Sequence, residues 1–161
     1  MQSVINAHNF KVLKRKDNPE KKMCNCRKQT CPLNGKCCID NLIYRATVKT
    51  NESEKTYIGC SEGPFKARLA NHTKSFTHKK YKNETKLSQY IWSLKEKNKQ
   101  FTLSWEIAAK ASPYVCGSRK CDLCLTEKLY ISKADPEKSL ISRAEIISTC
   151  RHRKKFTLQQ T

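Results

Sequence analysis

The middle of the chain carries five side chains whose chemistry suits phosphoryl transfer: Tyr44, Tyr57, Arg68, His72 and Glu127. Tyrosine and histidine can take part in proton transfer, arginine can stabilise developing negative charge, and a carboxylate can hold a divalent cation. The two tyrosines also have a simpler explanation, because tyrosine is enriched in β-strands whatever the function. Whether these five side chains could act together therefore depends on the strands and helices that position them.

Hydrophobic periodicity predicts three strands. Apolar and polar residues alternate over 42–48, a polar, turn-like stretch covers 49–55, and a second strand follows around Tyr57. Two strands so close in sequence are expected to form a hairpin. Alternation resumes over 101–107, where Phe101, Leu103, Trp105 and Ile107 are the apolar residues, and this predicts the third strand.

Helical spacing predicts four helices. The first begins near Pro64, since proline is favoured at the first helical position, and it places Arg68 and His72 four residues apart on one face. The other helices are predicted at 87–94, 121–132 and 138–149. The resulting order is β-β-α-α-β-α plus a terminal helix. It indicates an α+β fold in which helices pack on a small, mainly antiparallel, three-stranded sheet.

Glu127 is the acidic residue best placed to hold a metal. Helical steps of about 100° per residue put it on the same side as Leu123, Tyr130 and Ile131. A carboxylate on an apolar face is costly unless it is paired with an arginine or coordinates a metal. Glu145 on the last helix is the alternative, and basic neighbours there can neutralise it.

The charge of the chain points to a polyanionic partner. Its 161 residues suit one compact domain and contain 33 lysines and arginines against 14 acidic residues, a net charge of +19. The charges are spread through the predicted elements rather than gathered on one amphipathic face. This favours nucleic acid over an anionic membrane surface. No stretch is apolar for long enough to span a bilayer.

Ten cysteines without a secretory signal favour reduced, metal-binding thiols over a disulfide-bonded secreted protein. Zinc takes about four sulfur or nitrogen ligands. In one arrangement a single site is formed by Cys31, Cys37, Cys121 and Cys124. In the other, two local sites are formed, the first by Cys24, Cys26, Cys31 and Cys37 and the second by Cys116, Cys121, Cys124 and His152. Both leave Cys38 and Cys60 as ordinary buried thiols.

The chain resembles the core of the GIY-YIG endonucleases in Leu42-Ile43-Tyr44, in Tyr57-Ile58-Gly59, and in the Arg68 and His72 that follow. It departs from that pattern at Leu42, where the family has glycine, and at Ile141 and Ser142, where an asparagine is expected. Over nearly its whole length it resembles the endonuclease domain of Penelope-like retroelements. The residues that carry this wider resemblance are the early cysteines, Phe65-Lys66-Ala67-Arg68, Asn71-His72, Leu87-Ser88, Ile91-Trp92, Cys121-Asp122-Leu123-Cys124-Leu125 and Cys150-Arg151-His152.

The resemblance implies a role for each of the five side chains. Tyr44 would act as general base or orient the water, and Tyr57 would contact the scissile phosphate. Arg68 would stabilise the transition state, and His72 would assist proton transfer or phosphate binding. Glu127 would hold Mg²⁺ or Mn²⁺.

We therefore expect a DNA endonuclease that nicks duplex DNA in the nucleus. The resemblance further implies that the nick primes reverse transcription by a partner reverse transcriptase domain on its RNA. The alternative is a zinc-stabilised nucleic-acid-binding module without catalysis. We expect residues 1–23 to form a basic linker or helix, residues 24–40 a cysteine-rich zinc module, and residues 41–161 the endonuclease domain.

Overall fold

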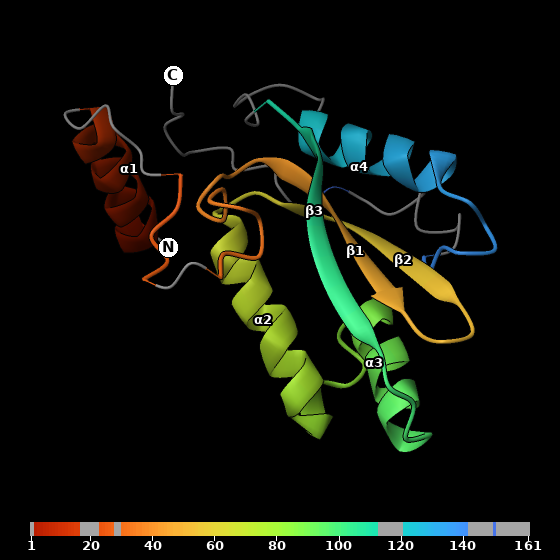
Figure 1. The fold of residues 1–161 in the computed structure, drawn as a ribbon. Coiled ribbons are helices and arrows are strands. Elements are labelled where there is room, and N and C mark those ends of the chain that lie inside the picture. The colour runs from red at the N-terminus through yellow and green to blue at the C-terminus, as the bar shows by residue number, and fades with distance from the viewer. Residues whose placement is uncertain (1, 17–22, 28–29, 113–120, 142–149, 151–161) are drawn as a thin grey trace.

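The computed structural model describes residues 2–16, 23–27, 30–112, 121–141 and 150 (Figure 1). From β1 to α4, its elements follow the predicted β-β-α-α-β-α order. No helix in the described ranges is long and apolar enough to cross a membrane. In chain order the elements are α1 (Gln2–Lys16), β1 (Leu42–Lys49), β2 (Glu54–Ser61), α2 (Phe65–Thr77), the short 3-10 helix η1 (Lys79–Tyr81), α3 (Lys86–Glu96), β3 (Thr102–Lys110) and α4 (Asp122–Lys133).

β1 is the central strand of the sheet. It pairs antiparallel with β2 on one side and with β3 on the other, so the strand order is β2-β1-β3. Tyr44 lies opposite Gly59 of β2 and Ile107 of β3, and the ladder to β3 is irregular between Ile43 and Tyr44. The prediction of an α+β fold with a three-stranded antiparallel sheet is therefore confirmed.

Both faces of β1 are buried, and different helices cover them (Figure 1). One face packs against α2 and α3 in a cluster that includes Tyr44, Phe65 and Ile91. The other face packs against α4, where Ile43 meets Leu123. The alternation predicted over 42–48 thus describes one buried face, and Ile43 belongs to the second. The fold is a sheet between two helical layers.

The start of α3 is fixed by a reciprocal pair of hydrogen bonds. The Ser88 amide donates to the Thr85 hydroxyl at 3.0 Å, and the Thr85 amide donates to the Ser88 hydroxyl at 3.1 Å. Such a capping box satisfies amides that the first helical turn leaves without partners. Trp92 of α3 also donates from Nε1 to the carbonyl of Ser75 in α2 at 2.8 Å. Together these contacts fix the connection between α2 and α3.

The prediction of a helix over 138–149 is wrong for residues 138–141. Residues 136–138 form a turn, and Ser139 makes an isolated parallel bridge to Thr56 of β2. The Thr56 amide donates to the Lys138 carbonyl, and the Leu140 amide donates to the Thr56 carbonyl, both at 2.8 Å. The unpaired backbone groups of the edge strand therefore hold these residues in place of helical bonds. Residues 142–149, which include Glu145, lie outside the described ranges.

The sequence predicts a basic linker or helix for residues 1–23. The structure has a helix there, α1, over Gln2–Lys16. Figure 1 shows α1 standing apart from the sheet, beyond the amino-terminal end of α2. Among the side chains described there, Val4 and Phe10 are large, apolar and exposed.

Candidate active site and cysteine clusters

A chain of hydrogen bonds joins three of the predicted site residues. Arg68 donates from Nε to the Tyr44 hydroxyl oxygen at 3.2 Å, and the same oxygen lies 2.7 Å from Nε2 of His72. Since an arginine nitrogen can only donate, the tyrosine oxygen accepts from Arg68 and is free to donate its own proton to His72. This direction requires Nε2 of His72 to be unprotonated.

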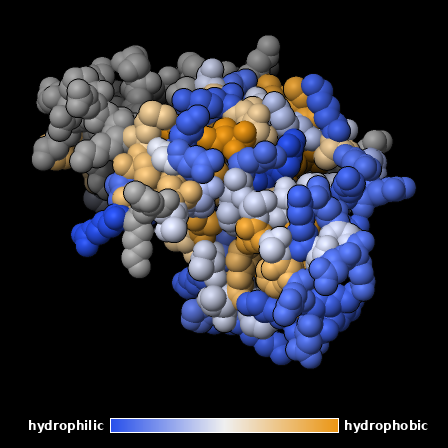
Figure 2. Space-filling view, in the orientation of Figure 1, coloured by the Kyte–Doolittle hydropathy of each residue, from blue (hydrophilic) through white to orange (hydrophobic). Residues whose placement is uncertain are grey.

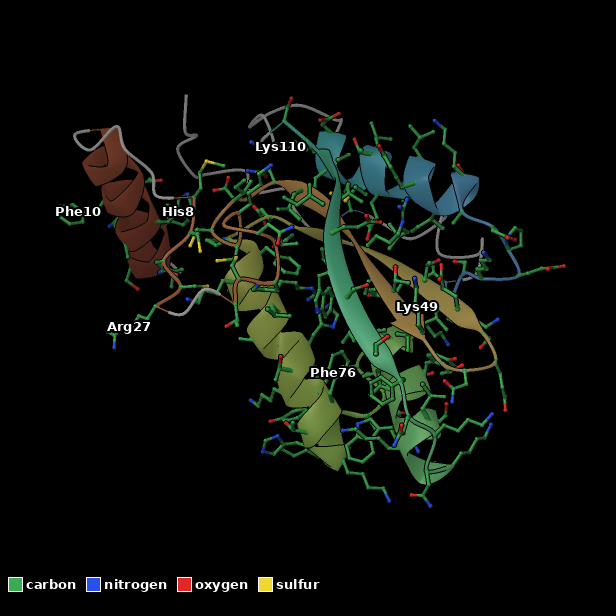
Figure 3. The ribbon with its side chains drawn as sticks, viewed as in Figure 1. His8, Phe10, Arg27, Lys49, Phe76 and Lys110 are labelled. Carbon is green, nitrogen blue, oxygen red and sulfur yellow. The ribbon has the colours of Figure 1, made fainter. Side chains whose placement is uncertain are left out.

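The surroundings of His72 favour that neutral form. The residue is 2% exposed, between α2 and the sheet. Burial, reinforced by the Arg68 guanidinium, lowers the pKa of His72 to about 4. At neutral pH the imidazole is therefore uncharged and accepts the tyrosine proton. Phe76, labelled in Figure 3, stacks on its ring at 5.9 Å between centroids.

The position of the Tyr44 ring depends on Gly59. These residues face each other across β1 and β2, and a Cβ atom at position 59 would lie 2.5 Å from Cζ of Tyr44. Contacts this short essentially never occur for real Cβ atoms. Glycine is therefore the one residue type at position 59 that leaves room for the phenol ring. This explains the glycine in physical terms, independently of any resemblance.

A pocket of about 310 Å³ opens beside this chain of hydrogen bonds. Its wall includes Tyr57 of β2, Arg68 of α2 and Glu127 of α4, which brings together side chains from the sheet and from both helical layers. Glu84, just before α3, and Lys86, its first residue, also line it. Because β2 is an edge strand, side chains from both helical layers can line a pocket beside it.

The electrostatics of the pocket show that its charged groups act on one another. Burial raises the pKa of Tyr57, the Arg68 cation opposes that rise, and the Glu127 carboxylate adds to it. Burial and then Glu127 also raise the pKa of the Cys60 thiol on β2. The half-buried Glu127 thus lies among a phenol, a guanidinium and a thiol. Such a pocket can hold an anion on Arg68 and a cation on Glu127.

All five predicted site residues converge on this region, but at two depths. Tyr57, Arg68 and Glu127 line the pocket, whereas Tyr44 and His72 are not among the described residues that do. Tyr44 has 0% exposure, and burial raises its pKa well above the usual range of a tyrosine. The ionised phenol that a general base requires is therefore strongly disfavoured.

The structure adds pocket residues that the sequence patterns missed. Asn83 and Glu84 end the connection between α2 and α3, and Gln89 lies on the first turns of α3. The signal that could have found them is Thr85, a preferred amino-terminal cap, which marks where the connection meets the helix. Ile141 also lines the pocket, at one of the two positions where the resemblance expects an asparagine.

The four early cysteines form one cluster. All four sulfur atoms lie within 4.8 Å of one another, and Sγ of Cys37 is 3.5 Å from those of Cys24 and Cys26. The single site shared with Cys121 and Cys124 is therefore wrong. Asn34 and Gly35 adopt positive φ angles of 51° and 84°, and this turn returns the chain to its starting cysteines. The four residues that could hold a metal ion here are Cys24, Cys26, Cys31 and Cys37.

Backbone amides prepare the first cluster for a cation. Burial raises the pKa of Cys31, but hydrogen bonds from the amides of Leu33 and Gly35 oppose it, and the pKa is lowered to about 6. Cys31 is then largely a thiolate at neutral pH. Four sulfur atoms within 4.8 Å of one another suit tetrahedral zinc. The four-cysteine cluster could therefore hold a structural zinc ion.

The first cluster is fastened to the start of α2. The Lys66 amide donates to the Cys37 carbonyl at 2.8 Å, and the Phe65 amide donates to the Ile39 carbonyl at 3.1 Å. The Lys66 side chain also reaches Oδ1 of Asn25 at 2.7 Å. These contacts satisfy amides at the helix start that no helical carbonyl can accept. The position of Arg68, less than a turn further along, therefore depends on this cluster.

A second cluster lies at the start of α4. The sulfur atoms of Cys121, Cys124 and Cys150 are within 4.8 Å of one another. Cys150 was not predicted as a ligand, and the predicted ligands Cys116 and His152 lie outside the described residues. Cys38 and Cys60 are half-buried, and neither belongs to a cluster.

Comparison of the chain with protein-family models, with curated proteins and with solved structures gives no match.

Proposed function

We propose that this protein is a metal-dependent endonuclease of the GIY-YIG type, which cleaves DNA by phosphodiester hydrolysis. The proposal depends above all on the convergence of Tyr57, Arg68 and Glu127, from three elements, on one pocket. A phosphodiester needs a cation for its charge and a divalent metal for its water, and this pocket offers groups for both. The buried Tyr44 and His72 behind Arg68 complete the set that the sequence pattern predicted.

The carboxylates of the pocket fit a hard divalent cation. Mg²⁺ and Mn²⁺ prefer oxygen ligands, and Glu127, Glu84 and Asn83 all line this pocket. Glu127 is the proposed ligand of Mg²⁺ or Mn²⁺. A metal bound there would lower the pKa of its water and so supply the nucleophile.

Arg68 is the group proposed to bind and stabilise the phosphate. Its guanidinium is always protonated and has several donors, one of which is already directed to Tyr44. That bond fixes the guanidinium and leaves other donors for the pocket. Tyr44 and His72 are in our proposal positioning residues that act through Arg68, because burial opposes ionisation of the phenol. Tyr57 presents the hydroxyl that faces the phosphate.

The charge of the protein supports a nucleic-acid substrate. The net charge is +19, and hydrophilic side chains cover much of the face seen in Figure 2, densely around α3. Near the pocket, Lys74 and Lys80 stand 4.7 Å and 4.8 Å from the centre of the Tyr81 ring, in η1. Lysines around an aromatic ring are a common feature of nucleic-acid-binding surfaces.

The resemblance to Penelope-like retroelements extends the proposal. The nick would leave a 3′ hydroxyl that primes reverse transcription by a partner reverse transcriptase domain on its RNA. That reaction would take place on chromosomal DNA in the nucleus.

Nicking of supercoiled DNA tests the proposal. We expect the wild-type protein to convert plasmid to open circles with Mg²⁺ or Mn²⁺. Glu127→Gln and Arg68→Ala should each reduce cleavage by about 100-fold or more, since each removes a group that stabilises developing charge. Glu106→Gln is the matched control, because Glu106 is an exposed glutamate on β3, at the opposite edge of the sheet, paired with Arg45. DNA binding should persist in all three variants.

The alternative function is a zinc-stabilised nucleic-acid-binding module without catalysis. It is favoured by the burial of Tyr44 and by the apolar side chain of Ile141 in the pocket. The same experiment separates the two functions. The binding module would be established if the wild-type protein binds DNA but never cuts it with either metal, and if the Glu127→Gln variant binds DNA as tightly as the wild type.

A further inference from the structure

We propose that Cys121, Cys124 and Cys150 hold a second zinc ion, which fixes the start of α4 and thereby the position of Glu127. The three sulfur atoms lie within 4.8 Å of one another, although Cys150 is far along the chain from the other two. Cys121 and Cys124 are 4% and 9% exposed, and Cys150 is half-buried. Three thiolates occupy three of the four positions of tetrahedral zinc and leave one for a further ligand.

Isolated buried cysteines often serve only as small apolar side chains, but three whose sulfur atoms lie within 4.8 Å of one another need another explanation. A disulfide would join two of them and leave the third thiol buried beside it. A zinc ion uses all three. Cys121 and Cys124 also have the Cys-x-x-Cys spacing that places two sulfurs on one metal. Of the disulfide and the zinc site, the zinc site is the one that accounts for all three cysteines.

The local structure at Cys121 suits a metal-bound thiolate. The residue precedes Asp122, the first residue of α4. The positive end of the helix dipole stabilises negative charge at this place. Asp122 in turn accepts a hydrogen bond from the Ser112 amide at 2.6 Å, just beyond the end of β3. The metal would thus join Cys150 to the start of α4, beside the end of β3.

The second cluster also bears on the pocket. Glu127 follows Cys124 by three residues on the same helix, an axial distance of about 4.5 Å. Leu123 and Ile131 pack α4 onto the sheet, and a metal at its start would fix the rotation and depth of the helix. The first cluster holds the start of α2, which carries Arg68. Two metal ions, one at the start of α2 and one at the start of α4, would then set the distance between Arg68 and Glu127.

Zinc content tests the second site directly. Protein purified under reducing conditions should contain two zinc ions per chain, and Cys150→Ser should contain one. Cys60→Ser is the matched control, because Cys60 packs against the same apolar cluster but belongs to neither cysteine cluster, and it should keep two. A wild-type protein with one zinc ion that Cys150→Ser does not change would overturn the site.

A second variant guards against loss of zinc through misfolding. Cys124→His keeps a zinc ligand at the same position and should retain two ions, whereas Cys124→Ser should retain one. Cobalt substitution gives an independent readout, since the intensity of the sulfur-to-cobalt absorption should fall by about three sevenths from wild type to Cys150→Ser as three of seven thiolates lose their metal. Equal zinc content and equal absorption in Cys124→His and Cys124→Ser would refute the assignment.

The effect on Glu127 rests on the proposed function, and the zinc site itself does not. We expect Cys150→Ser to require about tenfold more Mg²⁺ for half-maximal nicking while its DNA affinity is unchanged. An unchanged Mg²⁺ requirement in a protein that has lost one zinc would refute the coupling. If no protein cuts DNA, the proposed function fails, and the zinc counts still decide the metal site.

Discussion

Replacing Gly59 with alanine tests whether the close approach of β2 to the Tyr44 ring sets up the candidate active site. The added methyl group would lie 2.5 Å from Cζ of Tyr44. Carbon atoms pack at about 3.5–4.0 Å, so the ring must move by about 1 Å. Its hydroxyl now lies 2.7 Å from Nε2 of His72 and 3.2 Å from Nε of Arg68. A displacement of that size takes at least one of these contacts beyond hydrogen-bonding distance.

The expected cost follows from the two effects together. Overpacking of a close-packed site costs about 1–3 kcal/mol, and the loss of a buried hydrogen bond adds about 1 kcal/mol. Gly59→Ala should therefore lower the free energy of unfolding by about 2–4 kcal/mol, measured by urea denaturation. Gly63→Ala is the matched control, because a Cβ atom there meets no atom within 4 Å, and it should change stability by less than about 0.5 kcal/mol.

Changes at Tyr44 identify the atoms responsible. Tyr44→Phe removes the hydroxyl but keeps Cζ, so Gly59→Ala should still destabilise the Tyr44→Phe protein. Tyr44→Leu removes Cζ, and Gly59→Ala should then cost little. Equal stability of Gly59→Ala and Gly63→Ala would refute the reasoning, and so would full rescue by Tyr44→Phe.

Three further outcomes are expected. The pKa of His72 is 6.5 in the unfolded chain and about 4 in the folded protein, so the unfolded chain takes up the proton first as pH falls. The free energy of unfolding should therefore drop by about 3 kcal/mol between these pH values. His72→Gln should flatten this pH dependence, measured by urea denaturation. Cys31→Ser should lose one zinc ion and lower Tm by about 10 °C or more, whereas Cys38→Ser, outside both clusters, should not. Lys80→Gln should weaken DNA binding and reduce its salt dependence by about one counterion, measured as the slope of log K against log salt; an unchanged slope would place Lys80 away from the DNA.

The fold was largely predictable because its signals are local. Alternation over 42–48 and 101–107 marks two strands by their period, and the spacing of Arg68 and His72 marks a helix face whatever it packs against. The convergence of the five site residues was expected only from the resemblance to the GIY-YIG endonucleases. Periodicity by itself places each of them on an element and says nothing of their distances.

The errors arose where distant segments meet. The helix predicted from residue 138 failed because the backbone of Thr56, far away in sequence, binds residues 138–140. Cys150 was missed because no local spacing relates it to Cys121 and Cys124. The turn around Glu84 lacks periodicity and reaches the pocket only through the docking of α2 and α3. The reason for Gly59 needed the strand register, which places it opposite Tyr44.

The central place of β1 sets an order in which the molecule can fold. β1 and β2 are joined by a short turn, closed by a hydrogen bond from the Thr50 amide to the Ser53 carbonyl at 2.9 Å, so this hairpin can form within microseconds. β3 must wait for the chain between β2 and β3, which contains α2 and α3, to close. The space for the Tyr44 ring opposite Gly59 is thus built from the most local contacts, whereas Arg68 and Glu127 arrive with helices that dock later. Changes at Gly59 are therefore expected to slow folding, and changes at Glu127 are not.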